Sequence, residues 1–134
     1  MAKTLTTCEV LKLARDKIKD PENWNKGKGA MDEDGYWCEP YADVACSWCA
    51  LGAVRSVFPE DEFHDGAVNG MVQSFESVEN RYAFNRVKGL LERFVQGSDV
   101  IKFNDLKETT HEDVMAMFDK TIAFCEAEPR YKDW

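Results

Sequence analysis

The chain has 134 residues, of which 44% are hydrophobic, and a formal net charge of −8 at pH 7. This length and apolar content exclude a disordered chain and predict one domain spanning residues 1–134 with its own core. No apolar run approaches the roughly 20 residues of a membrane-spanning helix, so we expect none. Five cysteines, an odd number, and an N-terminus without an apolar signal-peptide core favour a cytoplasmic protein with reduced thiols.

The negative charge is concentrated in the middle of the sequence. Residues 31–79 contain eleven acidic residues and a single basic one, Arg55. An anionic nucleic-acid backbone would be repelled there, so we expect no direct nucleic-acid binding and, as the possible partner, a basic protein. The candidate partner surface consists of two acidic clusters: Asp32, Glu33 and Asp34, and then Glu60, Asp61 and Glu62.

The first predicted element is a helix at residues 7–19. Thr6 and Glu9 have the spacing of a capping box, and Asp20-Pro21 ends the helix. Residues 21–40 follow neither the helical nor the strand period and contain many turn formers and aromatic residues. We therefore expect an ordered loop there, in which Asp34-Gly35 could close a short hairpin.

Residues 41–57 are predicted to form a central helix, because apolar residues occupy most of its circumference. Gly52 inside this helix costs about 1 kcal/mol of helix propensity relative to alanine. A backbone that crosses closely over the surface of Cys49, Gly52 and Ala53 would explain that glycine. Residues 60–77 are ambiguous and could contain a short helix.

Two further helices are predicted at residues 78–96, ended by Gly97, and 111–126, where Thr110 is the N-cap. Between them, Val100–Phe103 is predicted to be extended, and Asn104-Asp105 to turn the chain. The fold class is therefore mainly α, a single domain of about four principal helices with a Trp-rich irregular loop or a small β-hairpin.

Cys46 and Cys49 have the spacing of a metal-ligand pair and could close a zinc site with Cys38 and His64. Because the pair lies in an apolar predicted helix, buried structural cysteines are the favoured interpretation, and we expect no metal and no cofactor. A redox pair is disfavoured, since no strand precedes the motif and no basic residue is near to stabilise a thiolate.

Asn104, Asp105, Thr110 and His111 place four polar groups near one helix N-terminus, where a phosphate or carboxylate could bind. The alternative is structural: a turn, a helix cap and an exposed first-turn histidine. No serine, cysteine or second acid is placed to complete a catalytic triad with His111. The tryptophans Trp24, Trp37 and Trp48 are favoured as core anchors over the wall of a pocket.

One ordered set of residues is similar to the pattern of a family of small bacterial and phage proteins: Trp24, Gly27, Ala30, Asp34-Gly35, Cys49-Ala50-Leu51-Gly52-Ala53, Asn104-Asp105, Thr110-His111, Val114 and Phe118-Asp119. The resemblance extends from Trp24 to about Ala123. It implies a helical fold and a bacterial or viral source, but no activity, because the family is a domain of unknown function. Cys38, Cys46 and His64 are outside the pattern, which weakens a zinc site built on them.

Three functions follow as hypotheses. The favoured one, since no catalytic constellation is present, is a non-enzymatic binding or regulatory protein that contacts a basic protein through its acidic middle region. The second is a binder of an anionic small molecule, or an enzyme, in which Asn104, Asp105 and His111 converge in a cleft beside an aromatic wall. The third is a DNA-mimicking inhibitor, which requires a continuous acidic stripe.

Overall fold

The computed structural model describes residues 5–58, 75, 77–95, 97 and 99–131. The elements in chain order are α1 (Thr7–Ile18), the 3-10 turn η1 (Pro21–Asn23), β1 (Ala30–Met31), β2 (Ser47–Trp48), α2 (Ala50–Ser56), α3 (Val78–Glu92), α4 (Val100–Asp105), α5 (His111–Ala127) and the 3-10 turn η2 (Pro129–Tyr131). The predicted mainly α fold with a small sheet is confirmed. The second acidic cluster, His64 and nearly all of the ambiguous segment 60–77 lie outside the described residues.

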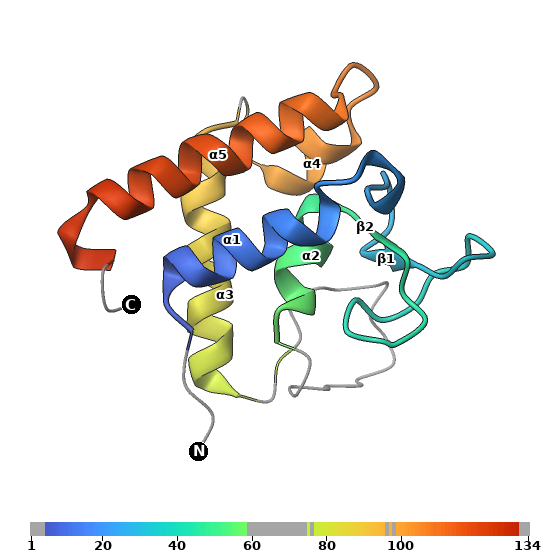
Figure 1. Cartoon of the computed structure of the whole chain (residues 1–134), viewed down its shortest axis with the longest axis horizontal. Helices are drawn as coiled ribbons and strands as arrows, with labels where there is room; N and C mark the ends of the chain where they lie inside the picture. The colour runs from blue at the N-terminus through green and yellow to red at the C-terminus, as the bar shows by residue number, and fades with distance from the viewer. Residues whose placement is uncertain (1–4, 59–74, 76, 96, 98, 132–134) are drawn as a thin grey trace.

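The first helix, α1, packs against α2, α3 and α5 and runs antiparallel to α5 (Figure 1). Its predicted capping box is present: the Thr6 hydroxyl accepts the Glu9 amide, and the Glu9 carboxylate accepts the Thr6 amide at 2.9 Å. The apolar residues that share its inner face are fully buried: Val10, Leu11, Ala14 and Ile18. Local sequence thus fixes where this helix begins, and burial of one face fixes how it packs.

The central helix, α2, is shorter than predicted. The prediction of a helix is wrong for residues 41–49. Ser47 and Trp48 instead form a strand that pairs antiparallel with β1, with Trp48 opposite Ala30. Cys49 then caps α2, its sulfur accepting the Gly52 amide at 3.2 Å. A short buried strand has the same apolar pattern as a buried helix. Every residue of α2 is buried, so its central position is confirmed.

The predicted hairpin is present, and the residues on either side of its turn pair over a short distance. The Asp32 amide donates to the Tyr36 carbonyl at 2.9 Å, and Gly35 has a φ of 84° within the turn. Beyond the turn, Met31 and Trp37 form an antiparallel bridge, and the Cys38 amide donates to the Ala30 carbonyl at 3.2 Å. The longer strand pairing of β1 is with β2, whose two residues are buried. Short paired strands are stable only when they pack against other parts of the protein.

Between the two long C-terminal helices, Val100–Phe103 is helical and not extended as predicted. The Asp99 carboxylate accepts the Lys102 amide at 3.1 Å and caps α4. Val100 and Asn104 are both buried, and the i, i+4 spacing of a helix places them on one face. The preceding helix, α3, ends at Glu92 and not at residue 96.

The backbone crossing predicted from Gly52 is confirmed. A Cβ atom at Gly52 would lie 1.8 Å from the carbonyl oxygen of Gly29. The loop that leads into β1 therefore passes directly over α2, at a distance that only glycine permits.

We predict that Gly52→Ala lowers the free energy of unfolding by at least about 3 kcal/mol, because the added methyl group meets backbone that cannot rotate away. Gly89→Ala is the matched control: it lies in α3 with nothing within 4 Å of the added Cβ. That variant should gain up to about 1 kcal/mol from helix propensity. Urea unfolding of both variants measures the difference, and equal stabilities would contradict the crossing.

Candidate functional site

Asn104, in the last turn of α4, is the most connected of the predicted site residues and is 1% exposed. Its Oδ1 accepts the indole Nε1–H of Trp24 at 2.7 Å and the amide of Ala50 at 2.9 Å. Its Nδ2 donates to the carbonyl of Asn25 at 3.1 Å and to Oδ1 of Asp105 at 3.0 Å. Two donated and two accepted bonds are the full capacity of a carboxamide, so Asn104 has no group left for a ligand.

Asp105 and Lys26, which lie at the surface, form further hydrogen bonds in the same region. Oδ1 of Asp105 accepts the amide of Gly27 at 2.8 Å, and Gly27 has a φ of 90°, which favours glycine. The Lys26 ammonium donates to the carbonyl of Leu106 at 2.6 Å. It also lies 5.6 Å from the centroid of the Trp24 ring. The loop from Trp24 to Gly27 is therefore held against the C-terminal end of α4, where a cation is favoured.

His111, the first residue of α5, lies beside Trp24 with a ring-centroid distance of 5.9 Å. Its Nε2 is 2.6 Å from the carbonyl oxygen of Ile18 at the end of α1. A carbonyl only accepts hydrogen bonds, so Nε2 carries the hydrogen and donates it. His111 thus satisfies a carbonyl that the end of α1 leaves without a helical partner.

Thr110 is the N-cap that the sequence predicts. Its hydroxyl accepts the amide of Asp113 at 3.1 Å, and the Asp113 carboxylate accepts the amide of Thr110 at 2.9 Å. The side chain is exposed and serves the first turn of α5.

The structure brings Asn104, Asp105 and His111 together around Trp24, the convergence that an anion-binding site requires. Each of the three, however, bonds to the protein itself. We call these residues with Trp24 the Asn104 junction, because they join α4, α2, α5, α1 and the loop before β1. Its geometry supports a structural role, and the binding of an anion there stays a prediction.

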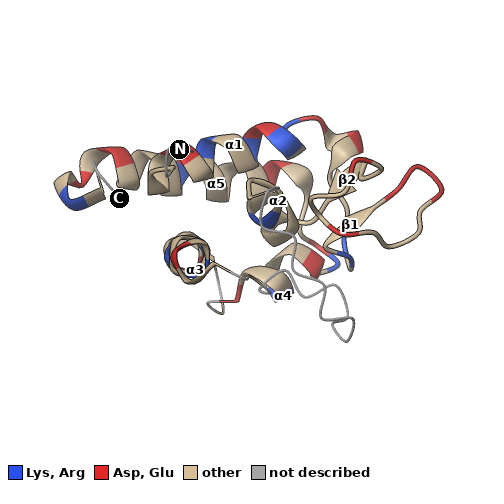
Figure 2. Cartoon of the chain, turned by 90° about the horizontal axis from the view of Figure 1, so that it is seen from below, with Lys and Arg blue, Asp and Glu red and all other residues tan. Residues whose placement is uncertain are grey.

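A second candidate site is the segment 32–46, which we call the acidic loop. It contains five acidic residues and no lysine, arginine or histidine: Asp32, Glu33, Asp34, Glu39 and Asp43. Arg55, the one basic residue of the middle region, is 2% exposed and lies 4.8 Å from the centroid of the Tyr41 ring. It therefore adds little positive charge to the surface. Acidic residues of this loop project away from the helices, beyond β1 and β2 (Figure 2).

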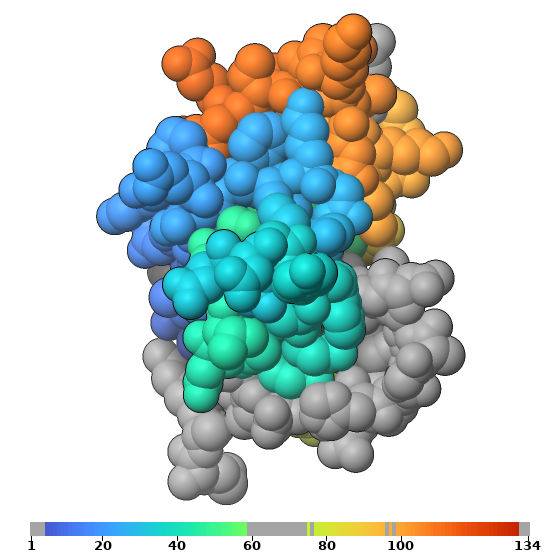
Figure 3. All heavy atoms as spheres, turned by 90° about the vertical axis from the view of Figure 1, so that its right-hand side faces the viewer, coloured from blue at the N-terminus to red at the C-terminus, as the bar shows by residue number. Residues whose placement is uncertain are grey.

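The acidic loop also exposes large apolar side chains. Tyr36 is 71% exposed, Val44 59% and Trp37 43%. The prediction that Trp37 anchors the core is wrong, whereas Trp48, at 8% exposure, does so. Residues from this part of the chain occupy the centre of the face in Figure 3. Aromatic side chains placed among acids on the surface are typical of a contact site for another protein.

Hydrogen bonds give the acidic loop a defined shape. The Asp32 carboxylate accepts the amides of Asp34 at 2.9 Å and Tyr36 at 3.0 Å. The Cys46 amide donates to the Met31 carbonyl at 2.8 Å, and the Trp48 indole donates to the Pro40 carbonyl at 2.9 Å. The loop is thus tied at its tip, at its middle and at its return into β2.

Contrary to the prediction, Cys46 and Cys49 do not lie in one helix. Cys46 is exposed before β2, its thiol donating to the carbonyl of Val44 at 3.4 Å, whereas Cys49 is buried as the cap of α2. Burial raises the pKa of the Cys49 thiol to about 11. Among the residues that the structure describes, no three His, Cys, Asp or Glu side chains are grouped to hold a metal ion.

Fold and site together define a small helical protein whose buried polar residues hold its own segments together and whose acidic loop is presented to solvent. The chain belongs to a family of unknown function, DUF6197, and the match covers residues 2–124. The resemblance to an uncharacterised family is thereby confirmed, and membership brings no activity with it. No curated protein and no solved structure matches the chain. In the described part of the chain, every helix is too short or too polar to cross a membrane.

We predict that Asn104→Ala lowers the free energy of unfolding by about 3 kcal/mol, because it leaves buried donors on Trp24 and Ala50 without an acceptor. Asn104→Asp keeps both acceptor positions and loses the two donors, so it should cost less than the alanine variant at low pH, where the new carboxyl can be protonated. Thermal unfolding with and without inorganic phosphate distinguishes the structural role of Asn104 from a role in anion binding. A rise in Tm with phosphate that Asn104→Ala abolishes would favour the anion site instead.

We predict that iodoacetamide modifies Cys46 well before Cys49 in the folded protein at about pH 8. With its pKa near 11, only about one thousandth of the Cys49 thiol is ionised there, and burial blocks access as well. Since the pKa is raised, labelling of Cys49 should increase as the pH rises towards 11 and on unfolding in urea. Peptide mapping measures each site, with Cys46→Ser as the control. Equal labelling rates in the native protein would contradict the capping role of Cys49.

Proposed function

We propose that this protein is a non-enzymatic binding protein that holds a basic protein partner on its acidic loop. The observation that carries the proposal is the exposure of Tyr36 and Trp37 on a loop fixed by hydrogen bonds and flanked by carboxylates. Tyrosine and tryptophan supply much of the binding energy of protein interfaces when a partner buries them.

The chemistry of the loop specifies the partner's surface. An apolar pocket would cover the side chains of Tyr36, Trp37 and Val44, and lysine or arginine around it would face Glu33 and Asp34. The carboxylates would mainly accelerate association and select the partner, while the aromatic side chains would slow dissociation. Because the loop is already ordered, binding loses less conformational entropy than a flexible loop would.

A DNA-mimicking role is supported less well. That role requires acids spread in a stripe with the spacing of phosphates. Within the described residues, five of the six acids of the middle region lie on one loop among exposed aromatic side chains, and the sixth, Glu79, is in α3. This mixture favours a contact that is partly apolar and partly ionic.

Site-specific photocrosslinking identifies the partner and tests the surface together. Tyr36→p-benzoylphenylalanine should crosslink a basic protein in a lysate of the source organism. Tyr82→p-benzoylphenylalanine is the matched control, since Tyr82 is 62% exposed on α3, outside the acidic loop. Crosslinking from position 82 but not from position 36 would contradict the proposal.

We predict that Trp37→Ala weakens binding of the purified partner by at least about 30-fold, the effect of losing one interface hot spot. Tyr82→Ala should leave the affinity unchanged within about twofold. Glu33→Gln combined with Asp34→Asn should slow association and reduce its dependence on salt. Titration calorimetry and stopped-flow kinetics measure these effects. A Trp37→Ala protein that binds as tightly as the wild type would exclude the loop as the main contact.

A further inference from the structure

The antiparallel pair of α1 and α5 is held in one register by contacts along its length. At one end His111 bonds to the carbonyl of Ile18. In the middle, Nε of Arg15 donates to Oδ1 of Asp119 at 2.6 Å. Further on, Lys12 forms an ion pair with Glu126. When the same register is continued by one turn towards the start of α1, the first turn of α1 lies opposite the last turns of α5.

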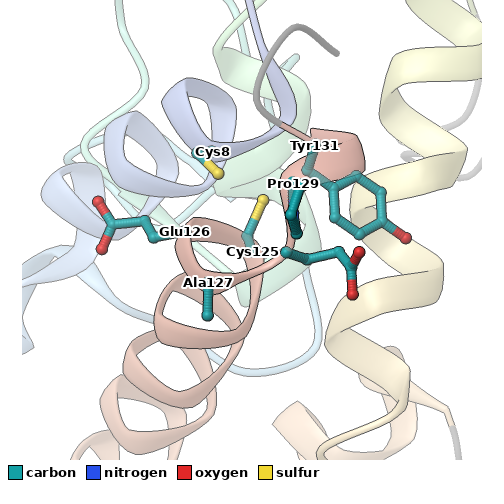
Figure 4. A pocket seen from close by; sticks show the side chains of 7 residues that line it. Cys8, Cys125, Glu126, Ala127, Pro129 and Tyr131 are labelled. Carbon is teal, nitrogen blue, oxygen red and sulfur yellow. The ribbon is translucent and has the colours of Figure 1, made fainter.

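Cys8 of α1 and Cys125 of α5 meet at that end. Their sulfur atoms point towards each other between the helices (Figure 4). Cys125 is 1% exposed and Cys8 is half-buried. Both line a pocket of about 390 Å³ whose wall includes Glu126, Glu128 and Tyr131. A small molecule that enters this pocket reaches a pair of facing thiols.

We propose that Cys8 and Cys125 are a dithiol site, which a neutral low-molecular-weight disulfide oxidises to an intramolecular disulfide joining α1 to α5. The inference is independent of the acidic loop. It rests on the register of the two helices, on the facing sulfur atoms and on the pocket that gives access to them.

The exchange proceeds in two balanced steps. The Cys8 thiolate attacks one sulfur of the small disulfide, which forms a mixed disulfide and releases the first small thiolate. The Cys125 thiol then loses its proton, attacks the sulfur of Cys8 and releases the second small thiolate. Each leaving thiolate takes up one of the two protons given up by the protein. The protein is oxidised by two electrons, and the small disulfide is reduced to two thiols.

The surroundings assign the order of the steps. Cys8 reacts first because it is the more accessible of the two thiols. Burial, and then the neighbouring Cys8 thiol, raise the pKa of the Cys125 thiol, so closure of the protein disulfide is the slow step. A thiol of high pKa is also a poor leaving group, and the disulfide should therefore resist reduction once formed.

An uncharged oxidant suits the charges at the pocket. Glu126 and Glu128 contribute to its wall, where Glu126 is paired with Lys12 and Glu128 with Arg130. An uncharged disulfide can enter without competing with either ion pair. Bis(2-hydroxyethyl) disulfide is therefore the probe of choice.

The experiment treats the folded full-length chain with bis(2-hydroxyethyl) disulfide under anaerobic conditions. We expect the loss of two hydrogen atoms in the intact mass, a Cys8–Cys125 linkage in the peptide map and a rise in Tm on the order of 10 °C. Cys46→Ser, which changes an exposed thiol elsewhere, should behave as the wild type.

Cys8→Ser should form no linkage and keep the Tm of the reduced wild type. This test remains valid even when the second variant, Cys125→Ser, does not fold. Wild-type protein that gains only mixed disulfides, or that links Cys8 or Cys125 to another cysteine, would overturn the proposal. So would a Cys8–Cys125 linkage that forms only in urea, because the folded register would then not be its cause.

Discussion

The four hydrogen bonds of the Asn104 side chain are the constraint on which the rest of the structure depends. A buried carboxamide is tolerated only when its donors and acceptors are satisfied, since each unmet group costs about 1–3 kcal/mol. Asn104 meets this condition by bonding to two segments that are distant in sequence, Trp24-Asn25 and Ala50, and to its neighbour Asp105. Its bond to the Ala50 amide also occupies the first amide of α2, and so helps to set where that helix begins.

The position of the acidic loop follows from this junction. Once Trp24 and Asn25 are fixed, the chain continues over α2 at Gly29, in contact with Gly52, and enters β1. The loop returns through Trp48, whose carbonyl accepts the Asn25 amide at 3.0 Å. Entry and exit are thus both anchored to the core beside the same buried asparagine. This is why an exposed, aromatic and acidic segment can keep a defined shape.

The elements that were predicted correctly are those whose signals are local. The capping box at Thr6 and the N-cap at Thr110 need only residues within three positions, and the apolar faces of α1, α3 and α5 repeat over several turns. Gly52 carried a long-range signal as well, because a glycine inside an apolar helix costs propensity that a close crossing explains.

The elements that were predicted wrongly depend on partners elsewhere in the chain. Ser47-Trp48 is a strand only because β1 lies beside it, and α4 is a helix because one face buries Val100 and Asn104. The candidate site was found in part: Asn104, Asp105 and His111 do converge. Their roles could not be read from spacing, since they depend on Trp24, about 80 residues away, and on the carbonyl of Ile18. The exposure of Trp37 likewise depends on the turn that precedes it.

The two ends of the α1–α5 pair are held by different kinds of interaction. At one end, Ile18 bonds to His111, which is part of the Asn104 junction and lies beside the Trp24 ring. Towards the other end, the polar contacts are ion pairs between exposed side chains, Lys12 with Glu126 and Arg15 with Asp119, and such pairs contribute little to stability in water. A covalent bond between Cys8 and Cys125 would thus add most where the existing polar contacts hold least. Because the thiol pair and the junction lie at opposite ends of the same helices, oxidation can strengthen one end without moving the residues that position the acidic loop.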